Sequence, residues 1–111
     1  MTKYLLINEM NCTDPTKEKE FNEWLNTVHL PDIMETKEYR RVTRYELIQG
    51  AEGKGKYITV SEIETDDFPA LTAAHNNRLA KKKELGHDTN LIKGVPGGRG
   101  LYKQIFELKQ K

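Results

Sequence analysis

The stretch Phe21-Asn-Glu-Trp24-Leu25-Asn-Thr-Val28-His29-Leu30-Pro31-Asp32-Ile33 holds an amphipathic helix that ends on an imidazole, a proline and a carboxylate. Its apolar residues recur at the i, i+3, i+4 and i+7 spacing of one helix face: Phe21, Trp24, Leu25 and Val28. This stripe must pack against a core, and His29 marks its border. Asp14-Pro15 supplies a cap and a first helical residue, and Pro31 discourages continuation, so we expect a helix from 15 to about 29.

The rest of the chain reads as four strands and a second helix. β-type residues fill the stretches 3–10, 39–48, 57–63 and 101–108. Asp66, Asp67 and Pro69 open a second helix, which should finish before Gly86. We expect the glycine-rich segment 94–100 to be a flexible flap, because it lacks the Lys-Ser/Thr ending and following helix of a phosphate loop. The order β-α-β-β-α-β predicts an α+β, ferredoxin-like fold with a four-stranded antiparallel sheet.

Both faces of this sheet carry apolar side chains. Alternation along residues 3–10 puts Tyr4 and Leu6 on one face and Leu5 and Ile7 on the other. Two helices can cover only one face, and an antiparallel sheet with a wet face should show polar residues there. We therefore expect a homodimer that forms through the sheet faces.

Composition excludes several classes of protein. Lys and Arg number 18 against 17 Asp and Glu, so the net charge of +1 gives no field that would attract nucleic acid or a membrane surface. No apolar run approaches the roughly 20 residues of a membrane helix. A single cysteine and a start without a signal-peptide pattern favour the cytoplasm. At 111 residues we expect one domain, 1–111.

Seven residues also carry a resemblance to a known family. The helix pattern of Phe21, Trp24, His29, Pro31 and Asp32, followed by Arg44 and Tyr45 in a strand, resembles the dimeric α/β-barrel superfamily, particularly its small EthD-like members. The resemblance implies that two sheets face each other in a barrel, with a ligand cavity between each sheet and its helices or loops. Members of the superfamily include cofactor-free cyclases and isomerases, small monooxygenases and haem-degrading enzymes.

His29 and His75 are the candidate catalytic residues. His29 lies at a helix end, where Asp32 could fix its tautomer, and the alternative is that both residues only terminate the helix. His75 borders the apolar side of the second helix, and its alternative is a satisfied histidine beside the core. For substrate binding we select Asn8, Asp32, Arg44, Tyr45 and Glu62, with Ser61 and Gln104 as further polar residues on apolar strands. Arg44 is chosen because a guanidinium in a cavity holds a carboxylate or enolate oxygen.

Three functions remain open at this stage. The first is a cofactor-independent enzyme that abstracts a proton beside the carbonyl of a small hydrophobic compound, in a cyclisation or isomerisation. The second is a haem-degrading or quinol-type monooxygenase, suggested by the Asn8 and His75 positions but opposed by Ser61 and Glu62, where the haem-degrading members place a Trp. The third is a non-catalytic dimer that binds a small molecule or a protein. We expect neither a metal nor a cofactor, because three histidines without repeated carboxylate or thiol spacing form no metal pattern.

Overall fold

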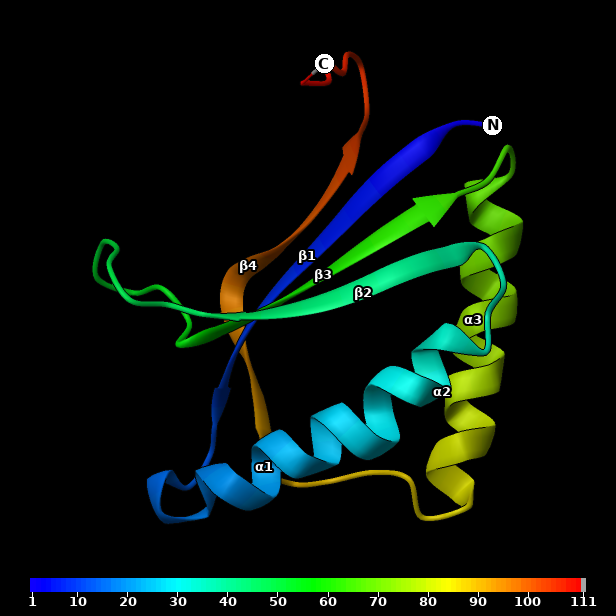
Figure 1. Cartoon of the computed structure of the whole chain (residues 1–111). Coiled ribbons are helices and arrows are strands. Elements are labelled where there is room, and N and C mark those ends of the chain that lie inside the picture. The colour runs from blue at the N-terminus through cyan, green and yellow to red at the C-terminus, as the bar shows by residue number, and fades with distance from the viewer. Residues whose placement is uncertain (111) are drawn as a thin grey trace.

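The computed structural model describes residues 1–110 and has the predicted order of elements (Figure 1). The strands are β1 (Lys3–Cys12), β2 (Tyr39–Glu46), β3 (Tyr57–Glu64) and β4 (Ile92–Lys103). The helical segments are η1 (Pro15–Lys17), α1 (Glu18–Trp24), η2 (Leu25–His29), α2 (Leu30–Met34) and α3 (Phe68–Glu84). The strands form one antiparallel sheet in the order β2-β3-β1-β4, which confirms the ferredoxin-like prediction.

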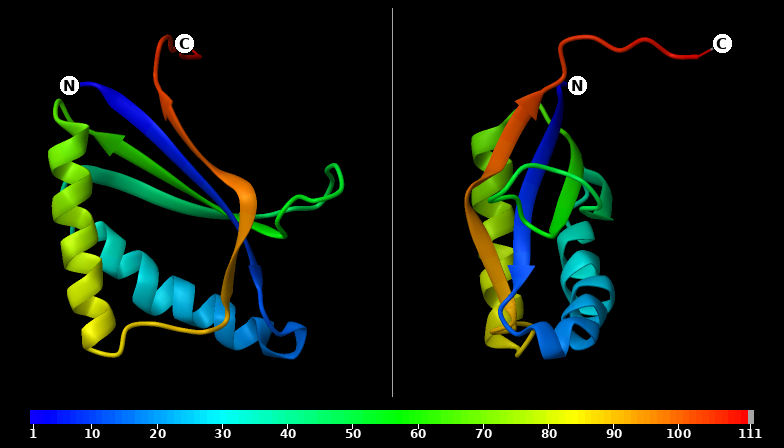
Figure 2. Two further views of the ribbon diagram at one scale, coloured as in Figure 1. Left: turned by 180° about the vertical axis from the view of Figure 1, so that it is seen from behind. Right: turned by 90° about the vertical axis from the view of Figure 1, so that its left-hand side faces the viewer.

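The helices cover one face of the sheet, and two apolar clusters fill the space between (Figure 2). One cluster packs Leu6, Ile33, Tyr39, Ile63 and Leu71 together beneath α2 and α3. The other cluster joins the predicted stripe to the sheet and contains Met10, Phe21, Leu25, Tyr57 and Leu91. Phe21 and Leu25 are fully buried, so the stripe is core, as its spacing predicts.

The first helix does not end at His29. It continues through Pro31 to Met34, because residues 25–29 form a wide π-helical turn in which the Leu30 N–H bonds to the Leu25 carbonyl. Proline lacks an N–H and clashes with the carbonyl four residues back in a regular helix, and the wider turn accommodates it. Our expectation of a helix end at about residue 29 is therefore wrong.

The glycine-rich segment is part of β4 and not a flap. Asn8 pairs with Arg99 and Met10 pairs with Gly94, so the residues between Gly94 and Arg99 bulge out opposite Glu9. Gly97 adopts φ +72°, a conformation that favours glycine. A Cβ on Gly98 would lie 2.8 Å from the Cβ of Glu9, so the close approach of the strands also requires glycine. The glycines therefore permit a bulge within the strand, and the expected flap is wrong.

The last strand also ends earlier than predicted. The Gln104 N–H donates to the Lys3 carbonyl at 2.8 Å, and beyond this point β1 has no residues left to pair. The segment 104–110 leaves the sheet without regular structure and runs away from the body of the protein (Figure 2). Ile105, Phe106 and Leu108 are 92%, 78% and 87% exposed.

The second face of the sheet carries no helix. Register places Leu5 opposite Glu62, Ile7 opposite Val60 and Glu9 opposite Ile58, and these side chains alternate with those that face the core. The aliphatic ones among them are only partly buried in the single chain. Among residues 1–110, no helix is both long enough and apolar enough to cross a membrane.

Candidate active site

A cavity of about 130 Å³, the inner cavity, lies between the covered face of the sheet and the helices. Its apolar lining comes from the core clusters and neighbouring residues: Leu6, Met10, Ile33, Phe68 and Leu79. Its uncharged polar lining is drawn from β1, β3 and α3: Asn8, Thr59, Ser61, Thr72 and Asn76. The remaining lining residues are His29, Tyr39, His75 and Arg99. The two predicted catalytic histidines therefore reach one cavity from different helices.

His75 is held by a chain of hydrogen bonds. The Arg78 Nη1 donates to Thr36 Oγ1 at 2.9 Å, and Thr36 Oγ1 lies 2.8 Å from His75 Nδ1. The Tyr39 ring stacks on the imidazole with 4.3 Å between centroids and 14° between planes. Thr36 is only 3% exposed and His75 7%, so both polar groups depend on these contacts.

The contacts favour one tautomer of His75. Thr36 accepts from Arg78, and His75 Nδ1 is the partner to which its single buried hydroxyl proton can be donated. We therefore assign the ring proton to Nε2. Burial lowers the pKa of His75, and the positive charges of Arg78, Arg99 and, when it is protonated, His29 lower it further. A neutral imidazole with its proton on Nε2 is a hydrogen-bond donor, which suits it to a developing oxyanion rather than to the role of base.

His29 is placed differently. The π-helical turn brings residues five apart onto one another, and the His29 ring stacks on Trp24 at 4.9 Å with 13° between planes. Burial lowers the pKa of His29, and the carboxylate of Asp32 partly offsets this. In the part of the chain that the structure describes, the ring of His29 forms no hydrogen bond. A neutral ring with an unoccupied nitrogen is able to accept a proton.

Arg99 reaches the cavity from β4. It pairs with Asn8, whose side chain faces the helices, so Arg99 comes to the same face directly after the bulge. Bulges often redirect a side chain next to a site. Sequence reasoning missed Arg99 because the number of residues in a bulge decides which face the following residues take, and alternation does not reveal it. Tyr39, Thr36 and Arg78 were missed as well, since nothing local marks them.

Asp32 does not hold His29. Its Oδ2 lies 2.9 Å from His87 Nδ1, and its Oδ1 lies 3.9 Å from Lys82 Nζ. The continued helix explains this, because it directs the buried Asp32 towards α3 and the loop that follows α3. The predicted hydrogen bond to His29 is corrected to an electrostatic effect on the pKa of His29.

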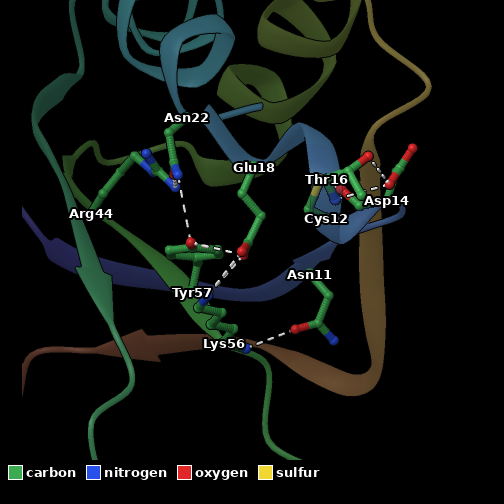
Figure 3. Close-up of polar contacts among 9 residues, drawn as sticks. All are labelled: Asn11, Cys12, Asp14, Thr16, Glu18, Asn22, Arg44, Lys56 and Tyr57. Carbon is green, nitrogen blue, oxygen red and sulfur yellow. Dashed lines mark hydrogen bonds and ion pairs between the residues drawn. The ribbon is translucent and has the colours of Figure 1, made fainter. Parts of the chain in front are cut away.

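Arg44 is not among the residues that line the inner cavity, and its side chain lies beside Asn22 (Figure 3). Its Nη1 donates to Asn26 at 3.0 Å and its Nη2 to Asn22 at 2.8 Å. The guanidinium also lies over the rings of Phe21, at 5.8 Å, and Tyr57, at 5.2 Å. These contacts join α1 and η2 to the sheet and give Arg44 a structural role. Its predicted hold on a substrate oxygen stays a prediction.

Tyr45 and Glu62 do not line the inner cavity either. Tyr45 is 54% exposed, and Glu62 lies on the uncovered face, 3.6 Å from the Arg41 guanidinium. Of the polar strand residues, Asn8 and Ser61 face the cavity, whereas Glu62 and Gln104 do not. Within residues 1–110, no group of three or more His, Cys, Asp or Glu is arranged to hold a metal ion. The prediction of no metal stays a prediction.

Comparison with known proteins supports the assignment of the fold. No family model matches the chain, and no curated protein matches its sequence. Four solved structures resemble the chain over nearly its whole length. HapK from Hahella chejuensis is 14% identical with a TM-score of 0.67 and covers 97% of this chain and 98% of its own. A putative monooxygenase from Shewanella loihica PV-4 is 18% identical with a TM-score of 0.62, covering 96% and 99%.

Two further structures are described in terms of this fold. A dimeric ferredoxin-like protein of unknown function from Thermobifida fusca is 14% identical with a TM-score of 0.53, covering 95% and 92%. An EthD family protein from Bacillus halodurans is 15% identical with a TM-score of 0.50, covering 96% and 100%. The chain shares its ferredoxin-like fold with these structures. This confirms the predicted ferredoxin-like fold of the single chain, and at these identities the comparisons carry the fold alone.

Proposed function

We propose that this protein is a small enzyme that abstracts a proton beside a carbonyl group, with the inner cavity as its active site. One observation carries the proposal. Two histidines with lowered pKa meet in a cavity, one with an unoccupied ring nitrogen and one fixed as a hydrogen-bond donor. A base and an oxyanion donor are the two groups that enolisation needs.

The division of roles follows from the contacts. A ring nitrogen of His29 takes the proton from the carbon beside the carbonyl, and the electron pair of that C–H bond moves to the carbonyl oxygen. His75 Nε2–H and the Arg99 guanidinium donate hydrogen bonds to the resulting enolate oxygen. The proton then returns from His29 to another carbon in an isomerisation, or the enolate carbon attacks a second carbonyl in a cyclisation. Burial keeps both imidazoles neutral at the start of this sequence.

The test is exchange of an acidic C–H proton. We would incubate the protein with a panel of aromatic ketones, lactones and 1,3-diketones in deuterium oxide and follow loss of the C–H signal by NMR. The wild type should accelerate exchange, and His29→Gln should abolish the acceleration. His87→Gln is the matched control, because His87 pairs with Asp32 and does not line the inner cavity. Absence of exchange and of binding across the panel would contradict the proposal.

A non-catalytic binding dimer is the alternative. The cavity of about 130 Å³ is small compared with the roughly 300 Å³ and more of typical ligand pockets, which favours this alternative. The same volume speaks against a haem-degrading enzyme, because a macrocycle needs far more room. The Shewanella structure is described as a putative monooxygenase, so a monooxygenase acting on a smaller substrate is a further candidate. His29→Gln separates catalysis from simple binding, since it should remove exchange and leave binding of a ketone in place.

We also propose that the protein acts as a homodimer that pairs through the uncovered sheet face. Leu5, Ile7, Ile58 and Val60 lie there together, and burying apolar surface stabilises by about 25 cal/mol per Å². The likeness to a dimeric ferredoxin-like protein supports this assembly. Analytical ultracentrifugation tests it directly, and a well-folded 12.9 kDa monomer would contradict it.

A further inference from the structure

We infer that the inner cavity selects an anionic ligand, a small carboxylate with an apolar body, and that Arg99 is the residue that binds the carboxylate. The inference rests on the proposed function in one respect, since it takes the inner cavity as the ligand site. The inference adds that the ligand is an anion and that Arg99 is the residue that binds its charged group.

The charge of the lining is the first step. Arg99 is the one lining residue with a permanent charge, and among residues 1–110 no aspartate or glutamate lines the cavity. In the same described range, Arg99 forms no ion pair. Arg78 adds a second positive charge behind Thr36, and its guanidinium donates to a neutral hydroxyl. The whole chain carries a net charge of only +1, so this local excess does not follow from composition.

The chemistry of the lining is the second step. A guanidinium binds a carboxylate through two parallel N–H···O bonds, and Asn8, its partner across the β1–β4 ladder, places an amide on the same face. The apolar wall of the cavity includes Leu6, Ile33 and Phe68. This wall offers nothing to a fully hydrated phosphate and suits the hydrocarbon part of an organic acid.

The size of the cavity is the third step. Its volume of about 130 Å³ is close to the roughly 150 Å³ of an engineered protein cavity that binds benzene. A ligand with one ring, or a short branched chain, therefore fits with its carboxylate at Arg99. Such an acid would also carry the carbonyl or C–H group on which His29 and His75 act.

Benzoate and benzamide make a matched pair of probes, because they share shape and differ in charge. We would titrate each into the wild type, Arg99→Gln and Arg44→Gln by calorimetry. Arg44→Gln controls for loss of an arginine outside the cavity. We expect the wild type to bind benzoate more tightly than benzamide. Arg99→Gln should weaken benzoate about 10- to 100-fold, as loss of a charged hydrogen bond does, and leave benzamide unchanged.

Three results of the titrations with the wild type and Arg99→Gln would overturn the inference. They are equal affinity for the two probes, binding of neither probe, and a benzoate preference that survives Arg99→Gln in a variant whose melting curve is intact. The deuterium-exchange assay distinguishes these failures from failure of the proposed function. If exchange still depends on His29 but the protein shows no preference for the anion, the inference of a carboxylate ligand fails and the proposed enzymatic function stands. Loss of benzoate binding in Arg44→Gln as well as in Arg99→Gln would also overturn it.

Discussion

Replacing Thr36 by Val tests the hydrogen-bond chain behind His75. The substitution preserves the branched shape of the side chain and removes one hydroxyl. That hydroxyl bonds to His75 Nδ1 at 2.8 Å and accepts from Arg78 at 2.9 Å. Thr36 is 3% exposed, so water does not replace the lost partner at His75 without a structural change. The variant therefore leaves a buried acceptor unsatisfied and frees the tautomer of His75.

The cost follows from the number of groups left without a partner. One buried unsatisfied acceptor costs about 1–3 kcal/mol of the free energy of unfolding. Unfolding entropy is about 2.1 cal/mol/K per residue, so over this chain the melting temperature should fall by roughly 4–13 °C. The half-buried Arg78 can turn to solvent, so we assign no further cost to it.

Two measurements check the reasoning. Calorimetry or circular dichroism gives the melting temperature of Thr36→Val. Thr27→Val is the matched control, because the Thr27 hydroxyl bonds to the Glu23 carbonyl in an exposed position. The control should change stability by less than about 0.5 kcal/mol. Nitrogen-15 NMR of the His75 ring gives the tautomer. A wild-type ring protonated on Nδ1, or a Thr36→Val melting temperature equal to that of the control, would refute the assignment of the donor role.

The remaining predictions concern pH, the core and the tail. Burial lowers the folded pKa of His75, so the unfolded chain binds more protons below the ordinary value of about 6.5. The contribution of His75 to the free energy of unfolding should be complete above that pH and fall as the pH drops. Urea midpoints measured at a series of pH values should therefore depend less on pH in His75→Gln than in the wild type. An equal dependence on pH in the two proteins would count against burial of a neutral ring. Phe21→Ala should lower the free energy of unfolding by about 3–5 kcal/mol, because Phe21 is fully buried, and a urea-measured loss below 1 kcal/mol would contradict its place in the core. Phe106→Asp should leave the melting temperature unchanged, since Phe106 is 78% exposed, and a fall in the melting temperature measured by circular dichroism would contradict this exposure.

The elements and their order could be predicted from the amino-acid pattern. Phe21 and Leu25 recur at helical spacing, and the alternation of Leu5 and Leu6 in the first strand separates the two faces of the sheet. Such patterns are local, so they survive without knowledge of the partner elements. The histidines could be named as candidates for the same reason, because His29 stands at the border of a visible stripe.

Which polar groups come together depends on how the helices and strands pack. Arg99 enters the cavity and Arg44 does not, because a bulge in β4 sets the face of one and two asparagines hold the other. A π-helical turn carried the first helix past Pro31 and directed Asp32 to His87. Thr36 acquired its role from contact with residues about forty positions along the chain. Register, bulges and long-range hydrogen bonds depend on how elements pack together, and no local pattern encodes them.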